Sequence, residues 1–162
     1  MSGSAHPALA GMLAQAISEL SAASVPDEAL AVLRPARRIG PLTRPARFVP
    51  AGRAWRLGAL LLSRDAELFA TGSVVRAIVP KDFAANKSPA EEARRELQRA
   101  AARGPFTRGE SVNHGYEPAI GTVVLVDGDE PMLALPDARV PLRAYLDERV
   151  RLFAERGGTG DH

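Results

Sequence analysis

The sequence of 162 residues contains no cysteine, which excludes disulfide scaffolds, thiolate metal sites and cysteine nucleophiles. No apolar run approaches the roughly 18 consecutive residues that a membrane-spanning helix needs. The first residues also lack the basic start and continuous apolar core of a signal peptide. We therefore expect a cytoplasmic protein without a membrane partner.

Acidic side chains are absent from Ala29 to Arg64, although this stretch carries eight arginines. Of the 21 basic residues in the chain, 19 are arginine, whose planar fork pairs well with phosphate and carboxylate groups. The stretch therefore predicts an anion-binding surface, with nucleic acid as one candidate ligand. Its members are Arg37, Arg38, Arg44, Arg47, Arg53 and Arg56. The alternative is that codon usage in a GC-rich genome favours arginine and that these side chains pair with carboxylates elsewhere.

Catalytic motifs are also missing, because the chain has no Gly-rich phosphate loop, no G-x-S-x-G elbow and no H-E-x-x-H. Its three histidines are too scattered for a transition-metal site, so we expect no metal and no cofactor. One cluster could perform acid–base chemistry, namely His114 with Tyr116 and Glu117. The alternative is that His114 lies on a loop and only caps local backbone.

The composition is that of an ordinary globular protein, with 46% hydrophobic and 25% charged residues and a net charge of +2. This length fits one domain. We therefore predict a single domain over residues 1–162, with flexible tails near residues 1–7 and 157–162.

The stretch from Ala54 to Ile78 contains two apolar, β-favouring runs joined by a polar turn at residues 63–66. Alternation of faces along each run predicts a long, curved, two-stranded hairpin. Gly58 and Gly72 lie inside its strands, where glycine often marks a bulge or a close approach of another backbone. Because an isolated hairpin is only marginally stable, we expect the remaining elements to cover it.

Helices are predicted on both sides of this hairpin. Apolar residues at helical spacing indicate helices near residues 8–21 and after Pro141, the latter ending at Gly157-Gly158. Ser24 with Asp27 resembles a capping box for a short helix near residues 25–33. Ser88-Pro89-Ala90-Glu91 is a strong helix start, and Gly104-Pro105 ends that helix. Residues 104–118 are predicted to form a long loop, and strands are expected near residues 48–49, 122–126 and 132–135.

This order of elements predicts an α+β fold, with a mainly antiparallel sheet of about five strands and helices packed against it. A small, partly closed barrel is the alternative architecture.

Four segments together resemble a small family of uncharacterised proteins from high-GC bacteria, some of which are labelled glutaminases. They are WRLGALLL (55–62), LFATGSVVRA (68–77), SPAEEARRELQRAAARG (88–104) and GESVNHG (109–115). The resemblance covers about residues 45–155. Serine-dependent glutaminases resemble β-lactamases and need a Ser-x-x-Lys motif, which this sequence lacks, so the resemblance implies a family but no catalytic residues.

The sequence therefore favours a non-enzymatic binding module for an anionic ligand, which would be nucleic acid, a phosphorylated metabolite or an acidic protein surface. A small hydrolase or isomerase built on His114 is one alternative. A structural homodimer formed through the first or last helix is another.

Overall fold

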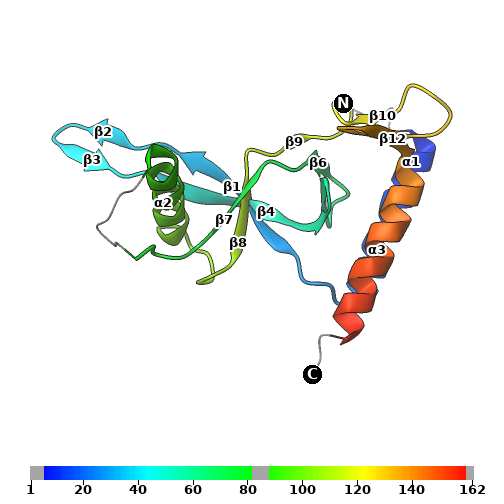
Figure 1. Ribbon diagram of the computed structural model, residues 1–162, viewed down its shortest axis with the longest axis horizontal. Helices are drawn as coiled ribbons and strands as arrows, with labels where there is room; N and C mark the ends of the chain where they lie inside the picture. Colours follow the sequence, from blue (N-terminus) through cyan, green and yellow to red (C-terminus); the bar gives the residue numbers. More distant parts are fainter. Residues whose placement is uncertain (1–5, 82–87, 160–162) are drawn as a thin grey trace. The chain divides into compact units, whose positions relative to one another are not determined.

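The computed structural model describes residues 6–81 and 88–159, which fold into two compact units. Each unit is made from separate stretches of the chain (Figure 1). Unit 1 comprises Met1–Asp27, Ala54–Thr71 and Tyr116–His162. Unit 2 comprises Glu28–Arg53 and Gly72–Gly115. Each unit has its own hydrophobic core, and the prediction of a single domain stays a prediction.

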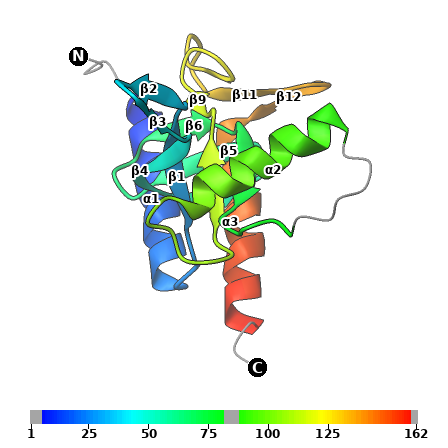
Figure 2. The same cartoon turned by 90° about the vertical axis from the view of Figure 1, so that its left-hand side faces the viewer.

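Unit 1 contains two helices and several short strands. Its elements are α1 (Pro7–Ala22), the end of β4 (Arg47–Leu57), β5 (Leu60–Ser63), β6 (Leu68–Ala70), β9 (Glu117–Pro118), β10 (Val124–Leu125), β11 (Met132–Leu135), β12 (Ala138–Pro141) and α3 (Leu142–Thr159). The two helices lie side by side and run in the same direction (Figure 2). The predicted flexible tails lie mostly outside the described residues, although Pro7 begins α1 and residues 157–159 belong to α3.

Unit 2 contains one helix and most of the longer strands. Its elements are β1 (Glu28–Arg34), β2 (Arg37–Ile39), β3 (Leu42–Arg44), the start of β4, β7 (Ser73–Arg76), α2 (Pro89–Ala102) and β8 (Ser111–His114). Small side chains of α2, Ala100 and Ala101, are fully buried against the unit 2 strands. The predicted start of α2 is confirmed, because the Ser88 side chain accepts a hydrogen bond from the Glu91 backbone N–H at 3.1 Å.

The α+β prediction is confirmed, but the predicted sheet of about five strands is wrong. The largest sheet has seven strands in the hydrogen-bonded order β7-β8-β1-β4-β5-β6-β9, and two smaller sheets pair β10-β11-β12 and β2-β3. Because the end strands of the described sheets do not pair with each other, these sheets are open, and the partly closed barrel is also wrong. Pairing is antiparallel in most ladders, whereas β1 and β8 are parallel.

The predicted central hairpin is divided into four strands. Gly58 has a φ of 67° and turns the chain between β4 and β5, a conformation that other residues rarely adopt. The Tyr145 hydroxyl closes this turn, since it accepts from the Ala59 N–H at 2.8 Å and donates to the Leu57 carbonyl at 3.2 Å. The polar turn at residues 63–66 is confirmed between β5 and β6. Beyond Gly72 the chain enters β7, which pairs with β8.

The unit 1 core forms around Trp55, which is 1% exposed. Its indole N–H donates to the Val25 carbonyl at 2.8 Å, so the largest buried side chain has its polar atom satisfied. The predicted apolar stripe of the last helix also lies in this core, with Leu142, Leu146 and Val150 buried. The helix continues through Gly157 and Gly158 to Thr159, so its predicted end is wrong.

Two further predictions of local structure are wrong. Residues 28–34 form strand β1 rather than part of a helix, and Ser24 has a φ of 52°, which is not the conformation of an N-cap residue. The predicted loop at 104–118 contains β8 and β9. In both cases pairing with distant strands overrides the local pattern.

Candidate functional site

The most exposed part of the predicted anion-binding stretch is a two-stranded ribbon formed by β2 and β3. All six residues of these strands are exposed. Pro35 and Pro45 lie just outside the ribbon and have no N–H to donate, so the ladder is interrupted there. Figure 1 shows the ribbon extending away from β1 and β4, the two strands that precede and follow it in the chain.

The register of the ribbon places its side chains on two faces. Arg37 pairs with Arg44, Arg38 with Thr43 and Ile39 with Leu42. Because side chains alternate along a strand, Arg37 and Arg44 share one face with Ile39 and Leu42. Arg38 lies on the other face. The ribbon therefore presents guanidinium groups on both of its faces.

The ribbon arginines differ from several other charged groups of the chain in their surroundings. Among the described residues, none of Arg37, Arg38 and Arg44 forms an ion pair. Arg37 and Arg44 lie directly opposite each other, and like charges in that position destabilise a β-ladder. A bound anion between the two guanidinium groups would remove this repulsion.

The arginines of α2 are arranged differently. Arg95 and Arg99, together with Arg103 at the C-cap, form ion pairs with glutamates of this helix. The alternative raised by the sequence, that arginines simply pair with carboxylates on the surface, therefore fits α2. It does not fit the ribbon.

The remaining arginines of the predicted site have other surroundings. Arg47 begins β4 and is exposed in unit 2. Arg53 forms an ion pair with Glu110 at 2.6 Å, and the Glu110 side chain is only 13% exposed. Arg56 is half-buried in unit 1 and has an interaction partner. The structure thus brings Arg37, Arg38 and Arg44 together, whereas Arg53 and Arg56 have local contacts of their own.

His114, the first acid–base candidate, ends strand β8 in unit 2 and is half-buried. Its ring packs against Phe48, with centroids 4.8 Å apart. Nε2 is buried and has no hydrogen-bond partner among the described residues. Burial lowers the pKa of His114, so the neutral ring is favoured. These surroundings are those of a packed side chain on a strand, whereas the sequence pattern placed His114 on a loop.

Tyr116 and Glu117 belong to unit 1, and their contacts differ from those of His114. Tyr116 packs edge to face against Phe69 with centroids 4.9 Å apart. Burial raises the pKa of Tyr116, and the charge of Glu67 adds to this effect. Glu117 is exposed on β9, opposite Ala70 of β6. The contacts of Tyr116 and Glu117 thus lie within unit 1, and the contact of His114 with Phe48 lies within unit 2.

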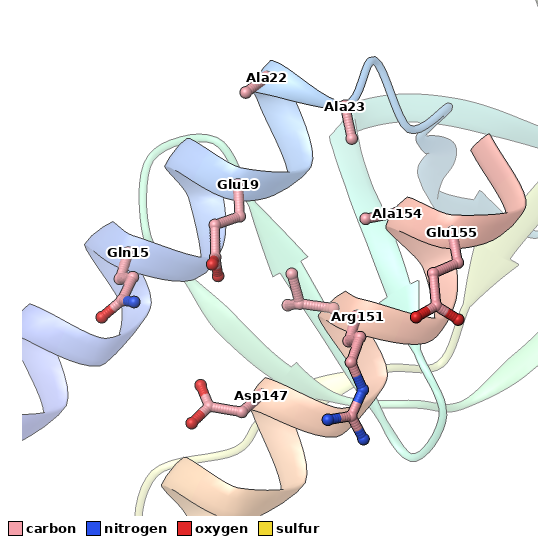
Figure 3. Close-up of a pocket in the computed structure, with 9 residues that line it drawn as sticks. Gln15, Glu19, Ala22, Ala23, Asp147, Arg151, Ala154 and Glu155 are labelled. Carbon is pink, nitrogen blue, oxygen red and sulfur yellow. The ribbon is translucent and has the colours of Figure 1, made fainter. Parts of the chain in front are cut away.

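An open groove of about 760 Å³ lies between α1 and α3 of unit 1. Figure 3 shows Glu19 on one wall and Asp147 and Arg151 on the other. Glu155 is a third carboxylate in the lining. Acidic groups therefore outnumber basic ones, and this groove is unsuited to an anion. Within the described ranges, no group of three or more His, Asp or Glu side chains could hold a metal ion.

Two residues at the tip of the ribbon were not identified by the sequence analysis. Ile39 is 46% exposed and Leu42 is 70% exposed. The sequence contains a signal for them, since Arg-Arg-Ile and Leu-Thr-Arg flank Gly40-Pro41 almost symmetrically. A Gly-Pro pair between two short segments of this kind favours a hairpin turn.

Comparisons with protein-family models, with curated proteins and with solved structures found no match to this chain. None of the helices that the structure describes is both long and apolar enough to cross a membrane.

Proposed function

We propose that the protein is a non-enzymatic nucleic-acid-binding module whose β2–β3 ribbon contacts a duplex. The observation that supports this most is the cross-strand pair Arg37 and Arg44, exposed and without carboxylate partners in the described part of the chain. Arginines on phosphate oxygens contribute affinity by releasing condensed counterions. The proposal includes a cytoplasmic location, and the resemblance to the family described above stays a prediction.

The shape of the site favours a polymer over a small phosphorylated ligand. Small-molecule sites are concave and bury most of their ligand. All six strand residues of the ribbon are instead exposed, as expected for an element that enters a groove of its partner. Two-stranded β-ribbons are among the elements that proteins place in the grooves of DNA, the minor groove included.

The two-faced charge of the ribbon favours nucleic acid over an acidic protein surface. Arg37 and Arg44 lie on one face and Arg38 on the other. A flat acidic surface would contact only one of these faces. A nucleic-acid groove has phosphates on both walls, so all three guanidinium groups can reach a phosphate at once.

The test is the salt dependence of duplex binding, measured by fluorescence anisotropy for the full chain. We expect binding at low salt that weakens as salt rises. Replacing Arg37, Arg38 and Arg44 with alanine should reduce the slope of log Kd against log salt by about 2.7, which is about 0.9 for each lost phosphate contact.

The control is a triple alanine variant at Arg94, Arg139 and Arg143, which are exposed outside the ribbon. Both variants change the formal net charge from +2 to −1, so a purely long-range charge effect would weaken them equally. We expect the control to keep the wild-type slope. The proposal fails if the wild-type protein does not bind at low salt, or if the two variants behave alike.

A further inference from the structure

The tip of the ribbon carries an exposed apolar pair. Ile39 and Leu42 are cross-strand partners and are 46% and 70% exposed. Apolar residues in strands are usually buried against the rest of the protein. No described residue covers either side chain enough to bury it. The pair is therefore accessible to a partner outside the described structure.

The turn between the two residues is conformationally restricted. Gly40 has a φ of 60°, and the ring of Pro41 fixes the next φ near −65°. A positive φ at the first central residue is the feature of a type II′ hairpin turn, which matches the twist of the flanking strands. The apolar pair is thus held in place before a partner binds, and less conformational entropy is lost on binding.

We propose that Ile39 and Leu42 form a wedge that inserts between base pairs of a duplex from the minor groove, unstacks them and bends the nucleic acid. This inference depends on the proposed function. Apolar side chains inserted between base steps are a common means by which minor-groove proteins kink DNA. The bend in turn brings more of the duplex into contact with the protein.

The spacing along the ribbon fits this role. Ile39 and Arg37 are on the same face and two residues apart, which is about 6.6 Å in a strand. The minor groove is about 7.5 Å deep. When the apolar pair contacts the floor of the groove, Arg37 and Arg44 lie near the phosphates at its rim. The same face therefore supplies a wedge and the charges that hold it in place.

The sequence of the ribbon also argues against a second copy of this chain as the occupant. A tip that packed against the same tip would bring two Arg37–Arg44 pairs close together without any acidic residue in the ribbon. This concentration of like charge opposes association. A polyanion instead neutralises it, so charge complementarity favours nucleic acid.

The experiment measures bending of a duplex of about 30 base pairs that carries a donor and an acceptor dye at its ends. A second duplex with 2-aminopurine at a central TA step reports unstacking. The test variant is Ile39→Ser with Leu42→Ser, and the control is Val74→Ser with Val79→Ser. The control residues are 42% and 75% exposed in the same unit but outside the ribbon.

We expect the wild-type protein and the control to raise energy transfer between the dyes and to raise 2-aminopurine fluorescence. The test variant should still bind the duplex at low salt, because its arginines are intact, and should lose both signals. Binding by the wild-type protein without either signal would overturn the wedge but not the proposed function. No wild-type binding at low salt would overturn both.

Two further outcomes would also overturn the inference. One is full bending by the test variant. The other is a wild-type dimer in light scattering that becomes a monomer in the test variant, since a second copy would then cover the pair.

Discussion

Arg37 lies directly opposite Arg44 in the β2–β3 ladder, and neither guanidinium group is paired with a described carboxylate. This arrangement costs folding free energy, because like charges in cross-strand positions repel each other. An isolated two-stranded ribbon has little other stabilisation. Binding and stability should therefore respond in opposite directions to a change of charge at this pair.

The first prediction concerns Arg44→Glu, which replaces a like-charge pair by an opposite-charge pair. We expect the ribbon to become more stable by about 0.2–1 kcal/mol. Amide hydrogen exchange at residues 37–44, measured by NMR, should slow accordingly. Duplex affinity should fall at the same time, because a carboxylate now faces the phosphates. A simultaneous gain in ribbon protection and in affinity would contradict the proposed site.

The second prediction separates Arg53 from the ribbon. Because Arg53 is paired with Glu110, Arg53→Ala should lower the free energy of unfolding by up to about 1 kcal/mol. Urea denaturation measures this change. The salt slope of duplex binding should stay at the wild-type value. A slope reduced by about 0.9 would instead show that Arg53 contacts a phosphate.

The third prediction follows from the lowered pKa of His114, whose burial favours the neutral ring. The unfolded chain then binds a proton at higher pH than the folded protein. Stability should therefore fall as the pH decreases through the ordinary histidine pKa near 6.5, until the folded protein also takes up the proton. Above that range the contribution is fully present.

His114→Gln is the matched variant for this effect, and denaturation midpoints between about pH 7.5 and 5 measure it. The variant should lose less stability than the wild-type protein over the same pH range. If both proteins lose the same amount, other groups cause the acid sensitivity.

The fourth prediction concerns Gly72, where the backbone of another strand approaches closely. A Cβ atom at this position would collide with the His114 carbonyl and the Gly115 backbone. Since backbone atoms cannot rotate away, Gly72→Ala should destabilise the protein by about 1–3 kcal/mol. Gly128→Ala is the control, because a Cβ there would meet no atom within 4 Å. Equal thermal stability of the two variants would contradict this close approach.

Local signals in the sequence were sufficient for several elements. The Ser88 cap, the polar turn at 63–66 and the stripe of the last helix are each specified within a few residues, and each is present in the structure. The position of β8 could not be inferred in this way. One of the two strands that pair with β8 is β1. Nothing in the local sequence of either strand indicates the register that aligns Ala29 with Val112.

The candidate site was predictable only in part. The absence of acidic residues drew attention to the stretch that contains the ribbon, and Arg37, Arg38 and Arg44 are exposed there. The sequence could not show that Arg53 has a partner, because Glu110 is distant along the chain. It also could not show that Ile39 and Leu42 are exposed, since apolar residues in strands are usually buried.

The parallel pairing of β1 with β8 also determines when each core can form. A ribosome must add 83 residues after Ala29 before its partner Val112 exists, so β1 leaves the exit tunnel with one edge unpaired. The core of unit 1 can form only later in synthesis, because it includes Leu142, Leu146 and Val150. Synthesis from the N-terminus should therefore complete unit 2 before unit 1. Because long-range strand pairing is slow, the nascent chain is a candidate client for chaperones until its strands have paired.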